Sequence, residues 1–427
     1  MADLDWNFTP DEALAHWPES TPLAALVTGS PDPRWGRLSI LAAPDELVEA
    51  RTAPEIDAAL ARLETDAWTA CLGYELGARF EPRACVRGRV PPDGWPALLL
   101  LRSRAQLRYD HATRRWSATP EAAALARALG ERVRAGAADA RGARIEGLET
   151  EIERAQYERM VAQAVERVRA GEVYQANLAQ RLRARWSGSA RAILRAALAA
   201  ARPRYGAYLE TPTHALVGMS PELFLDLDRA TRLATTRPIK GTRAFHVDPA
   251  RLVASEKDAA ELHMIVDLMR NDLGRVCEPA SVQVRTARAV ESHETVHHGV
   301  AEIAGTLRAG TTLAQLLRAS FPPGSVTGAP KVQAMRMIDE LEPVARGPYC
   351  GAVGFVDPAR MALNVSIRTI ALVRDAPGAE SGTLRYSAGC GIVADSDPVE
   401  EYEESLHKSA VMLRTAHALE RAGAMRA

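Results

Sequence analysis

The first 115 residues alternate short apolar runs with proline and glycine. The runs include RLSILAA at residues 37–43 and ALLLLRSRAQLRY at residues 97–109. Short apolar runs bounded by turn residues are typical of β-strands. The following RAGAADARGARIEG, at residues 134–147, is small, charged and interrupted by glycine, which indicates a solvated linker. We therefore predict a strand-rich N-terminal lobe with its linker over residues 1–147 and a second region over residues 148–427.

Apolar positions three or four residues apart predict helices in the second region. One helix places a single apolar face along residues 152–168 and ends at Gly171, and its face is formed by Ile152, Tyr157, Met160, Val161, Ala164, Val165 and Val168. Another ends at Gly274 and shows the same spacing in Leu262, Ile265, Val266 and Met269. A third is expected after Asp397, a suitable N-cap, with Pro398 at the first helical position.

Turn-bounded apolar runs predict strands between and after these helices. The runs occupy residues 207–228, 232–243, 349–357, 362–373 and 384–393. Strands and helices interspersed in this way agree with an α/β (α+β) protein, the fold class that the family resemblance described below implies.

The composition excludes several classes of protein. The net charge is only −1, so bulk electrostatics recruits neither nucleic acid nor a membrane surface. The five cysteines are scattered and form no C-x-x-C pair, which argues against a disulfide framework or a zinc site and favours a reducing compartment. The N-terminus lacks a signal-peptide pattern and no apolar run approaches about 18 residues. We expect a soluble, cytoplasmic protein.

Two helices carry carboxylates with helical spacing. Asp258 and Glu261 are three residues apart, and Glu401, Glu404 and Lys408 follow at i, i+3 and i+7. Each set lies on one helical face. Two such faces directed at one point would suit Mg²⁺, which binds one or two protein carboxylates and completes its octahedron with water and ligand oxygens. Spacing alone is equally compatible with solvated helix faces.

Four single residues and one turn are further candidates for chemistry. Gly389 and Gly391 interrupt a predicted strand, where glycine indicates close approach of a backbone or ligand. Lys240, in TTRPIKGTR at residues 235–243, is either a fixed cation or a nucleophile with a lowered pKa. Glu222 is either a surface charge or a general acid. The turn PPGSVTGAPK at residues 322–331 is either structural or an anion-binding turn.

Taken together, these stretches resemble one family, the chorismate-utilising enzymes. Its members include anthranilate synthase component I, aminodeoxychorismate synthase component I, isochorismate synthase and salicylate synthase. The matching blocks run in family order from about residue 150 to residue 415, and they are GEVYQANLAQRL, GMSPELFL, TTRPIKGTR, KDAAELHMIVDLMRNDLGRV, HETVHH, FPPGSVTGAPKVQAMRMIDELEP, YCGAVGFV, SIRT and AGCGIVADSDPVEEYEESLHKS. The resemblance implies large, mostly antiparallel sheets packed as a sandwich with outer helices, and an active site between the sheets.

The resemblance also implies roles for individual residues. Glu261 and Glu404 would face Mg²⁺, with Asp258 and Glu401 acting through water. Glu222 would be the general acid, and His298 matches the family's active-site histidine. The remaining matches would hold the carboxylates of chorismate, and they are Gly241, Thr242, Tyr349, Arg368, Gly389, Gly391 and Lys408.

Two positions distinguish the reactions that members of the family catalyse. Enzymes that add water carry a lysine where this chain has Gln175, and anthranilate synthases carry alanine where it has Lys240. In its lysine at position 240 this chain resembles aminodeoxychorismate synthase component I, in which the matching lysine is the nucleophile. The resemblance therefore implies amination of chorismate to 4-amino-4-deoxychorismate, the precursor of para-aminobenzoate and folate. It also implies ammonia supplied by a glutamine amidotransferase partner.

Two alternatives remain open at this point. An anthranilate synthase component I, or a bifunctional enzyme, would use Lys240 only as a binding cation. A non-catalytic chorismate-binding protein would be expected to lack one of four residues that this chain retains, Glu222, Lys240, Glu261 and Glu404. The chain shows no LLES-type motif, so feedback inhibition by tryptophan is not expected.

Overall fold

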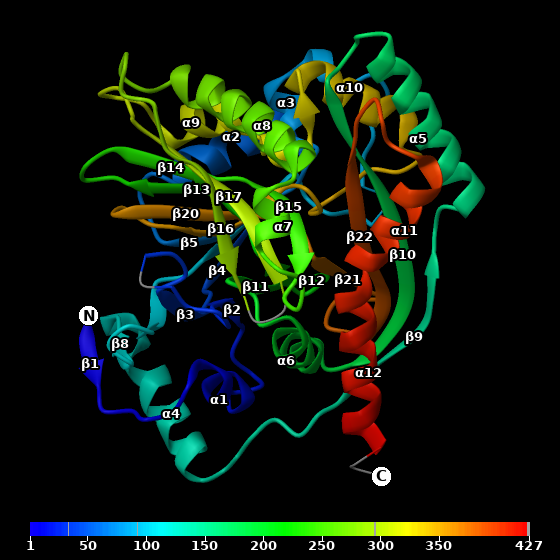
Figure 1. Ribbon diagram of the computed structural model, residues 1–427. Helices are drawn as coiled ribbons and strands as arrows, with labels where there is room; N and C mark the ends of the chain where they lie inside the picture. Colours follow the sequence, from blue (N-terminus) through cyan, green and yellow to red (C-terminus); the bar gives the residue numbers. More distant parts are fainter. Residues whose placement is uncertain (33, 92, 294–295, 425–427) are drawn as a thin grey trace.

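Two large antiparallel sheets dominate the computed structural model, which describes residues 1–32, 34–91, 93–293 and 296–424 (Figure 1). Among these residues the first sheet has the order β1-β8-β7-β3-β2-β11-β12-β21-β22-β10-β18, with β9 beside β10. Its strands are β1 (Ala2–Leu4), β2 (Ala24–Val27), β3 (Leu38–Ala43), β7 (Ala105–Asp110), β8 (Arg115–Ala118), β9 (Ala143–Thr150), β10 (Gln175–Gly188), β11 (Tyr205–Glu210), β12 (His214–Ser220), β18 (Gly328–Ala329), β21 (Thr369–Arg374) and β22 (Ser381–Ile392).

The second sheet has the order β15-β17-β14-β13-β20-β19-β5-β6-β4, with β16 beside β17. Its strands are β4 (Glu46–Ala50), β5 (Trp68–Leu72), β6 (Leu98–Arg102), β13 (Leu223–Asp228), β14 (Leu233–Arg237), β15 (Ile239–Ala244), β16 (Gln283–Ser292), β17 (Val296–Thr306), β19 (Ala352–Val356) and β20 (Arg360–Val365). The predicted antiparallel sheets and mixed fold class are therefore confirmed.

Helices cover both outer faces of the two sheets. They are α1 (Pro10–Ala15), α2 (Ala53–Arg62), α3 (Leu76–Phe80), α4 (Ala123–Arg134), α5 (Arg154–Arg169), α6 (Ala190–Ala201), α7 (Ala250–Val253), α8 (Glu256–Gly274), α9 (Leu313–Ser320), α10 (Lys331–Leu341), α11 (Pro398–Lys408) and α12 (Ala410–Ala424). Short 3-10 turns occupy Pro82–Ala84, Pro120–Ala122 and Gly324–Val326. None of the described helices is long and apolar enough to cross a membrane.

Three apolar cores hold the layers together. One joins α1, α4, α6 and α12 to the first sheet, and another joins α2, α8 and α9 to the second sheet and α5 and α10 to the β10 end of the first sheet (Figure 1). The third lies between the sheets and includes Trp95, Leu216 and Val353. This order of helices, sheet, sheet and helices confirms the predicted sandwich with outer helices.

The amphipathic helices form as predicted because each buries its apolar face. In α5 the buried residues include Tyr157 and Val161, and in α8 they include Leu262 and Ile265. The Asp397 carboxylate accepts hydrogen bonds from two backbone N–H groups at the start of α11, which confirms the predicted N-cap.

Strands from the predicted N-terminal lobe enter both sheets. In the first sheet β2 pairs with β11, and in the second β5 pairs with β19. Residue 147, the predicted boundary, lies within β9, which pairs with β10. The division into residues 1–147 and 148–427 stays a prediction.

Candidate active site

Lys240 lies at the edge of the second sheet, where β15 meets α8. The pairing of β15 with β17 shifts register between Ile239 and Thr242, and Gly241 has φ +81°. A Cβ on Gly241 would lie 2.7 Å from Leu252 Cδ1 and 2.9 Å from Asp258 Cγ, so glycine permits the close approach of this turn.

The Lys240 side chain is buried beside a carboxylate. Its Nζ lies 3.9 Å from Oε2 of Glu261, and 12% of the side chain is exposed. Burial lowers the pKa of Lys240, and the nearby Glu261 charge only partly opposes this shift. An amine with a lowered pKa is neutral, and therefore nucleophilic, in a larger fraction of molecules.

Gly391 of β22 brings the first sheet against Lys240. A Cβ at this position would overlap Nε2 of Gln175 and would lie 3.2 Å from Nζ of Lys240. Gln175 Nε2 also donates to Glu261 Oε2 at 3.4 Å. Lys240, Glu261, Gln175 and Gly391 thus meet from β15, α8, β10 and β22, four elements far apart in the sequence.

Replacing Gly391 by alanine is expected to lower kcat/KM of any reaction that uses Lys240 by about 10²-fold, because a displacement near 1 Å at a reacting group can cost that much. The methyl group would displace Gln175 and Lys240, whose side-chain ends are flexible, so thermal stability should change little. Gly274→Ala is the control, because a Cβ there meets no heavy atom within 4 Å. Equal kinetics for the two variants would contradict this placement.

Glu222 lies immediately before β13 and is 3% exposed. Burial raises its pKa to about 7, while the neighbouring Ser325 hydroxyl and Lys240 ammonium oppose the shift. Its Oε1 has no hydrogen-bond partner among the described residues. A carboxyl group with this pKa can donate a proton near neutral pH.

Several other buried polar atoms within the described ranges also have no hydrogen-bond partner, and we single out three of them. They are Asn177 Nδ2, Ser325 Oγ and Asn364 Oδ1. Because unsatisfied buried polar groups are costly, such atoms are typical of sites completed by a ligand or water. The sequence analysis named Ser325 only as part of the PPGSVTGAPK turn and did not name Asn177 or Asn364. The polar Asn177 between Ala176 and Leu178 could have indicated a functional position.

Tyr349 approaches Gly389. A Cβ on Gly389 would lie 2.8 Å from the Tyr349 hydroxyl and 2.9 Å from Asn177 Nδ2. Burial raises the pKa of Tyr349 well above its usual value, so the hydroxyl remains a proton donor.

His298 and Arg368 line a second part of the candidate site. They share with Met219, Pro221, Arg204 and His293 a pocket that is open to solvent. The Nδ1 of His298 lies 2.9 Å from the Thr242 hydroxyl. Burial, together with the Arg368 charge, lowers the pKa of His298 well below its usual value, so its imidazole is neutral at pH 7. Glu294 and Thr295 of the same HETVHH block lie outside the described residues.

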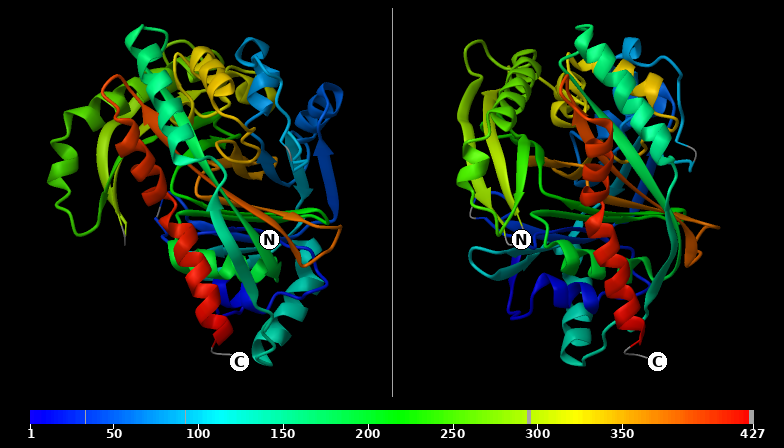
Figure 2. Two further views of the ribbon diagram at one scale, coloured as in Figure 1. Left: turned by 90° about the vertical axis from the view of Figure 1, so that its right-hand side faces the viewer. Right: turned by 45° about the vertical axis from the view of Figure 1, so that its right-hand side comes forward.

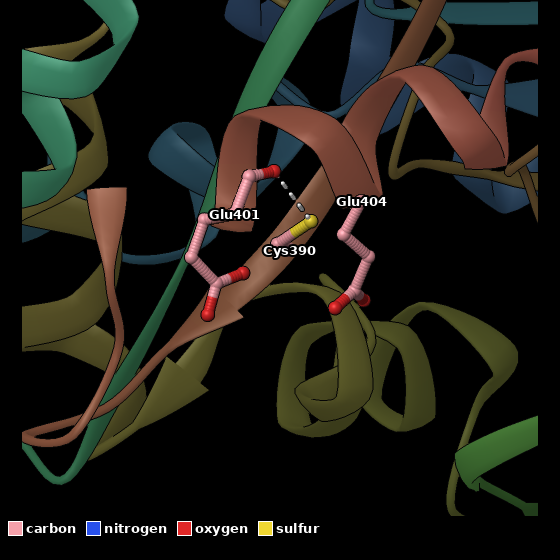
Figure 3. A group of neighbouring side chains, drawn as sticks. All are labelled: Cys390, Glu401 and Glu404. Carbon is pink, nitrogen blue, oxygen red and sulfur yellow. Dashed lines mark hydrogen bonds between the residues drawn. The ribbon is translucent and has the colours of Figure 1, made fainter. Parts of the chain in front are cut away.

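The predicted carboxylates of α11 lie beside a cysteine (Figure 3). Ligand atoms of Cys390, Glu401 and Glu404 lie within 4.8 Å of one another. Lys408 Nζ donates to Glu404 Oε1 at 2.7 Å and to the Gly389 carbonyl at 2.9 Å. Helices α5 and α11 run side by side against this end of the first sheet (Figure 2).

The ligand atoms of the Cys390, Glu401 and Glu404 group fit a hard cation that binds oxygen. Burial raises the pKa of Cys390 to about 12, so its thiol is neutral and a poor ligand. The carboxylate oxygens of Glu404 suit Mg²⁺, while Glu261, the other predicted ligand, is not part of this described group, and each of the two glutamates is paired with a lysine.

The two remaining predicted carboxylates already have partners. Asp258 Oδ2 accepts from Arg243 Nη2 at 2.6 Å, and Glu401 Oε1 accepts from the Ser396 hydroxyl at 2.6 Å. Burial raises the pKa of Glu401, although the Ser396 bond opposes this.

Most of the chain matches one known protein family. The family described as chorismate binding enzyme matches residues 25–414. The chain is a member of this family. The match confirms the resemblance found in the sequence and extends it into the N-terminal strands.

Individual relatives support the same conclusion. Aminodeoxychorismate synthase component 1 of Klebsiella aerogenes is 44% identical over 246 residues, which are 56% of this chain and 52% of the relative. The match therefore spans about half the length of that relative. Anthranilate synthase component 1 of Streptomyces coelicolor is 36% identical over 377 residues, 80% of this chain and 71% of the relative. The crystal structure of anthranilate synthase component I from Streptococcus pneumoniae has a TM-score of 0.75 at 26% identity and covers 88% of this chain and 92% of that one.

Proposed function

We propose that the chain catalyses amination of chorismate at C4, forming 4-amino-4-deoxychorismate from chorismate and ammonia. The observation that carries the proposal is Lys240, whose buried amine has a lowered pKa and lies near a carboxyl group, Glu222, with a pKa of about 7. Relatives named aminodeoxychorismate synthase component 1, at 40% to 44% identity, support it.

In the first step the neutral amine of Lys240 attacks C2 of chorismate. The C2–N bond forms, the two conjugated ring double bonds each shift by one position, and the C4–O bond breaks. Glu222 donates its proton to the departing hydroxyl, which leaves as water. A neutral nucleophile and a protonated acid can coexist near pH 7 because burial shifts their pKa values toward one another.

In the second step ammonia adds at C4 and the C4–N bond forms. The two double bonds shift back, the bond between C2 and Lys240 Nζ breaks to regenerate the free amine, and the proton lost by the new C4 ammonium returns to the Glu222 carboxylate. The covalent intermediate divides one difficult substitution into two easier ones. The Tyr349 hydroxyl, Arg368, Lys408 and the backbone around Gly389 hold the substrate carboxylates, while Gly241 and Thr242 shape the turn beside Lys240.

Mg²⁺ bound at Glu261 and Glu404 would neutralise a carboxylate of the substrate. Asp258 orients Arg243 beside the Gly241 turn. Glu401 has a ligand atom within 4.8 Å of one on Glu404. The neutral His298, held by Thr242, contacts the same pocket as Arg368 and can accept a hydrogen bond from the substrate.

Changing a metal-facing carboxylate is expected to weaken Mg²⁺ binding. We expect Glu404→Gln to raise the dissociation constant of Mg²⁺, measured by calorimetry with chorismate present, by at least about tenfold. Glu403→Gln is the matched control, because Glu403 lies on the same helix but pairs with Arg154 at 2.9 Å. Unchanged Mg²⁺ affinity in Glu404→Gln would remove this glutamate from the metal site.

Ammonia implies a partner for this reaction. The designation "component 1" of the relatives supports a second subunit, and a glutamine amidotransferase is the class of enzyme that releases ammonia from glutamine. The proposal therefore includes such a partner.

Anthranilate synthesis is the second candidate, because the Streptomyces coelicolor relative covers the larger share of this chain. Purified protein should be incubated with chorismate and Mg²⁺, with and without ammonium at mildly alkaline pH. We expect chorismate loss that requires ammonium. Loss without ammonium, yielding an isomer of chorismate with its hydroxyl at C2 and none at C4, would instead indicate addition of water.

A further inference from the structure

Arg346 lies between α10 and β19, and 3% of its side chain is exposed. Its guanidinium forms a fork with one carboxylate. Nε donates to Glu342 Oε2 at 2.9 Å and Nη2 donates to Glu342 Oε1 at 2.6 Å. The same Oε1 accepts the backbone N–H of Ala179 in β10 at 2.9 Å.

The remaining donors of Arg346 reach two backbone segments of the candidate active site. Nη2 donates to the Asn177 carbonyl at 2.5 Å, and Nη1 donates to the Val326 carbonyl at 3.2 Å. Asn177 lies opposite Gly391 in the β10–β22 register. Val326 follows Ser325, whose hydroxyl lies near the Glu222 carboxyl group.

Two aromatic rings flank the guanidinium. Its central carbon lies 4.5 Å from the ring centre of Tyr74 and 5.8 Å from that of Tyr349. The backbone N–H of Arg346 also donates to Glu75 Oε1 at 2.7 Å, which fixes the start of the loop leading to Tyr349. A planar guanidinium with donors in a fixed fork can hold all these groups in one geometry.

We propose that Arg346 is a positioning residue for chorismate amination: with Glu342 it fixes the Asn177 strand, the Ser325–Val326 turn and the Tyr349 ring relative to one another. The inference rests on the proposed function, and Arg346 itself contacts no reacting group. Lysine at this position keeps the charge but loses the fork, so the three segments lose their common anchor.

A second arginine provides a matched control for a purely structural role. Arg191 of α6 also forks onto one carboxylate, with Nε to Glu210 Oε2 at 3.2 Å and Nη2 to Oε1 at 2.5 Å. It likewise bonds two backbone carbonyls, those of Pro18 and Thr21. These contacts lie at the α1 and α6 end of the molecule, within the core that joins those helices to the first sheet.

The test compares Arg346→Lys with Arg191→Lys in the full chain. Both variants should show a similar fall in melting temperature. Only Arg346→Lys should lose kcat/KM for chorismate consumption, by about 10²-fold, with KM raised because Tyr349 is displaced. Arg191→Lys should stay within about twofold of wild type in both kinetic constants.

A second pair of variants tests the same inference if the first cannot be purified in folded form. If Arg346→Lys fails to fold, Glu342→Gln is compared with Glu210→Gln, and the same difference in KM is expected. Equal kinetic constants within either pair, in a wild type that consumes chorismate, would overturn the inference alone. A wild type that neither binds chorismate by calorimetry nor consumes it would overturn the proposed function and the inference with it.

Discussion

Replacing Lys240 by alanine is expected to lower formation of 4-amino-4-deoxychorismate by at least about 10⁴-fold, since loss of a covalent nucleophile costs this much or more. The mechanism leaves no other group to attack C2. Ammonia would have to substitute directly in a site shaped to hold the lysine against Gly391 and Glu261.

Lys240→Arg distinguishes the two roles of this residue. Arginine keeps the positive charge beside Glu261 but is not a nucleophile, because it stays protonated. If Lys240 is the nucleophile, the arginine variant should be as inactive as the alanine variant when product is followed by chromatography. If arginine restores most of the activity, Lys240 is a binding cation and the covalent mechanism is wrong.

Replacing Glu222 by glutamine is expected to lower kcat by about 10²- to 10⁴-fold, the usual contribution of a general acid. In wild type the rate should fall as pH rises through about 7, where Glu222 loses its proton. The remaining activity of Glu222→Gln should lack this alkaline decline, because glutamine does not titrate. A pH profile of kcat/KM identical in shape to wild type would assign the acid to another group.

The same substitution should stabilise the protein. Burial raises the pKa of Glu222 from 4.5 to about 7, so between these values the folded chain binds this proton more tightly than the unfolded chain. The free energy of unfolding therefore falls as pH rises from 4.5 to 7, and the cost is fully present above pH 7. By this linkage Glu222→Gln should be more stable than wild type at pH 8 by about 3 kcal/mol.

Urea denaturation at pH 8 and at pH 4.5 checks this expectation. The stability difference should be largest at pH 8 and small at pH 4.5, where wild-type Glu222 is protonated in the folded chain. A difference that is independent of pH would show that packing, and not the ionised carboxylate, causes it. A catalytic acid that costs stability is consistent with the strain that active sites store.

Local patterns predicted individual elements well, because each helix buries one apolar face. The faces of α5 and α8 and the N-cap of α11 follow directly from residue spacing. The sheet order does not, because the pairing of β2 with β11 joins residues about 180 positions apart in the chain. Strand register depends on which faces meet in space, and no local window contains that information.

Some residues of the candidate site could likewise be predicted from local sequence, and others could not. The motifs singled out Lys240, Glu222 and Gly391, whose unusual residue types are visible in their own short stretches. Asn177 and Arg346 were missed because their importance comes from tertiary partners, a glycine of β22 in one instance and two distant carbonyls in the other. A buried fork of this kind cannot be read from sequence spacing.

The most direct test of C4 amination is the position of nitrogen in the product. Wild-type protein should be supplied with chorismate, Mg²⁺ and ammonium labelled with nitrogen-15, and the product examined by NMR without further enzymes. Coupling of the label to the proton on C4 of a non-aromatic product is predicted. Aromatic product carrying the label at C2, which is anthranilate, would contradict the account and make Lys240 a binding residue.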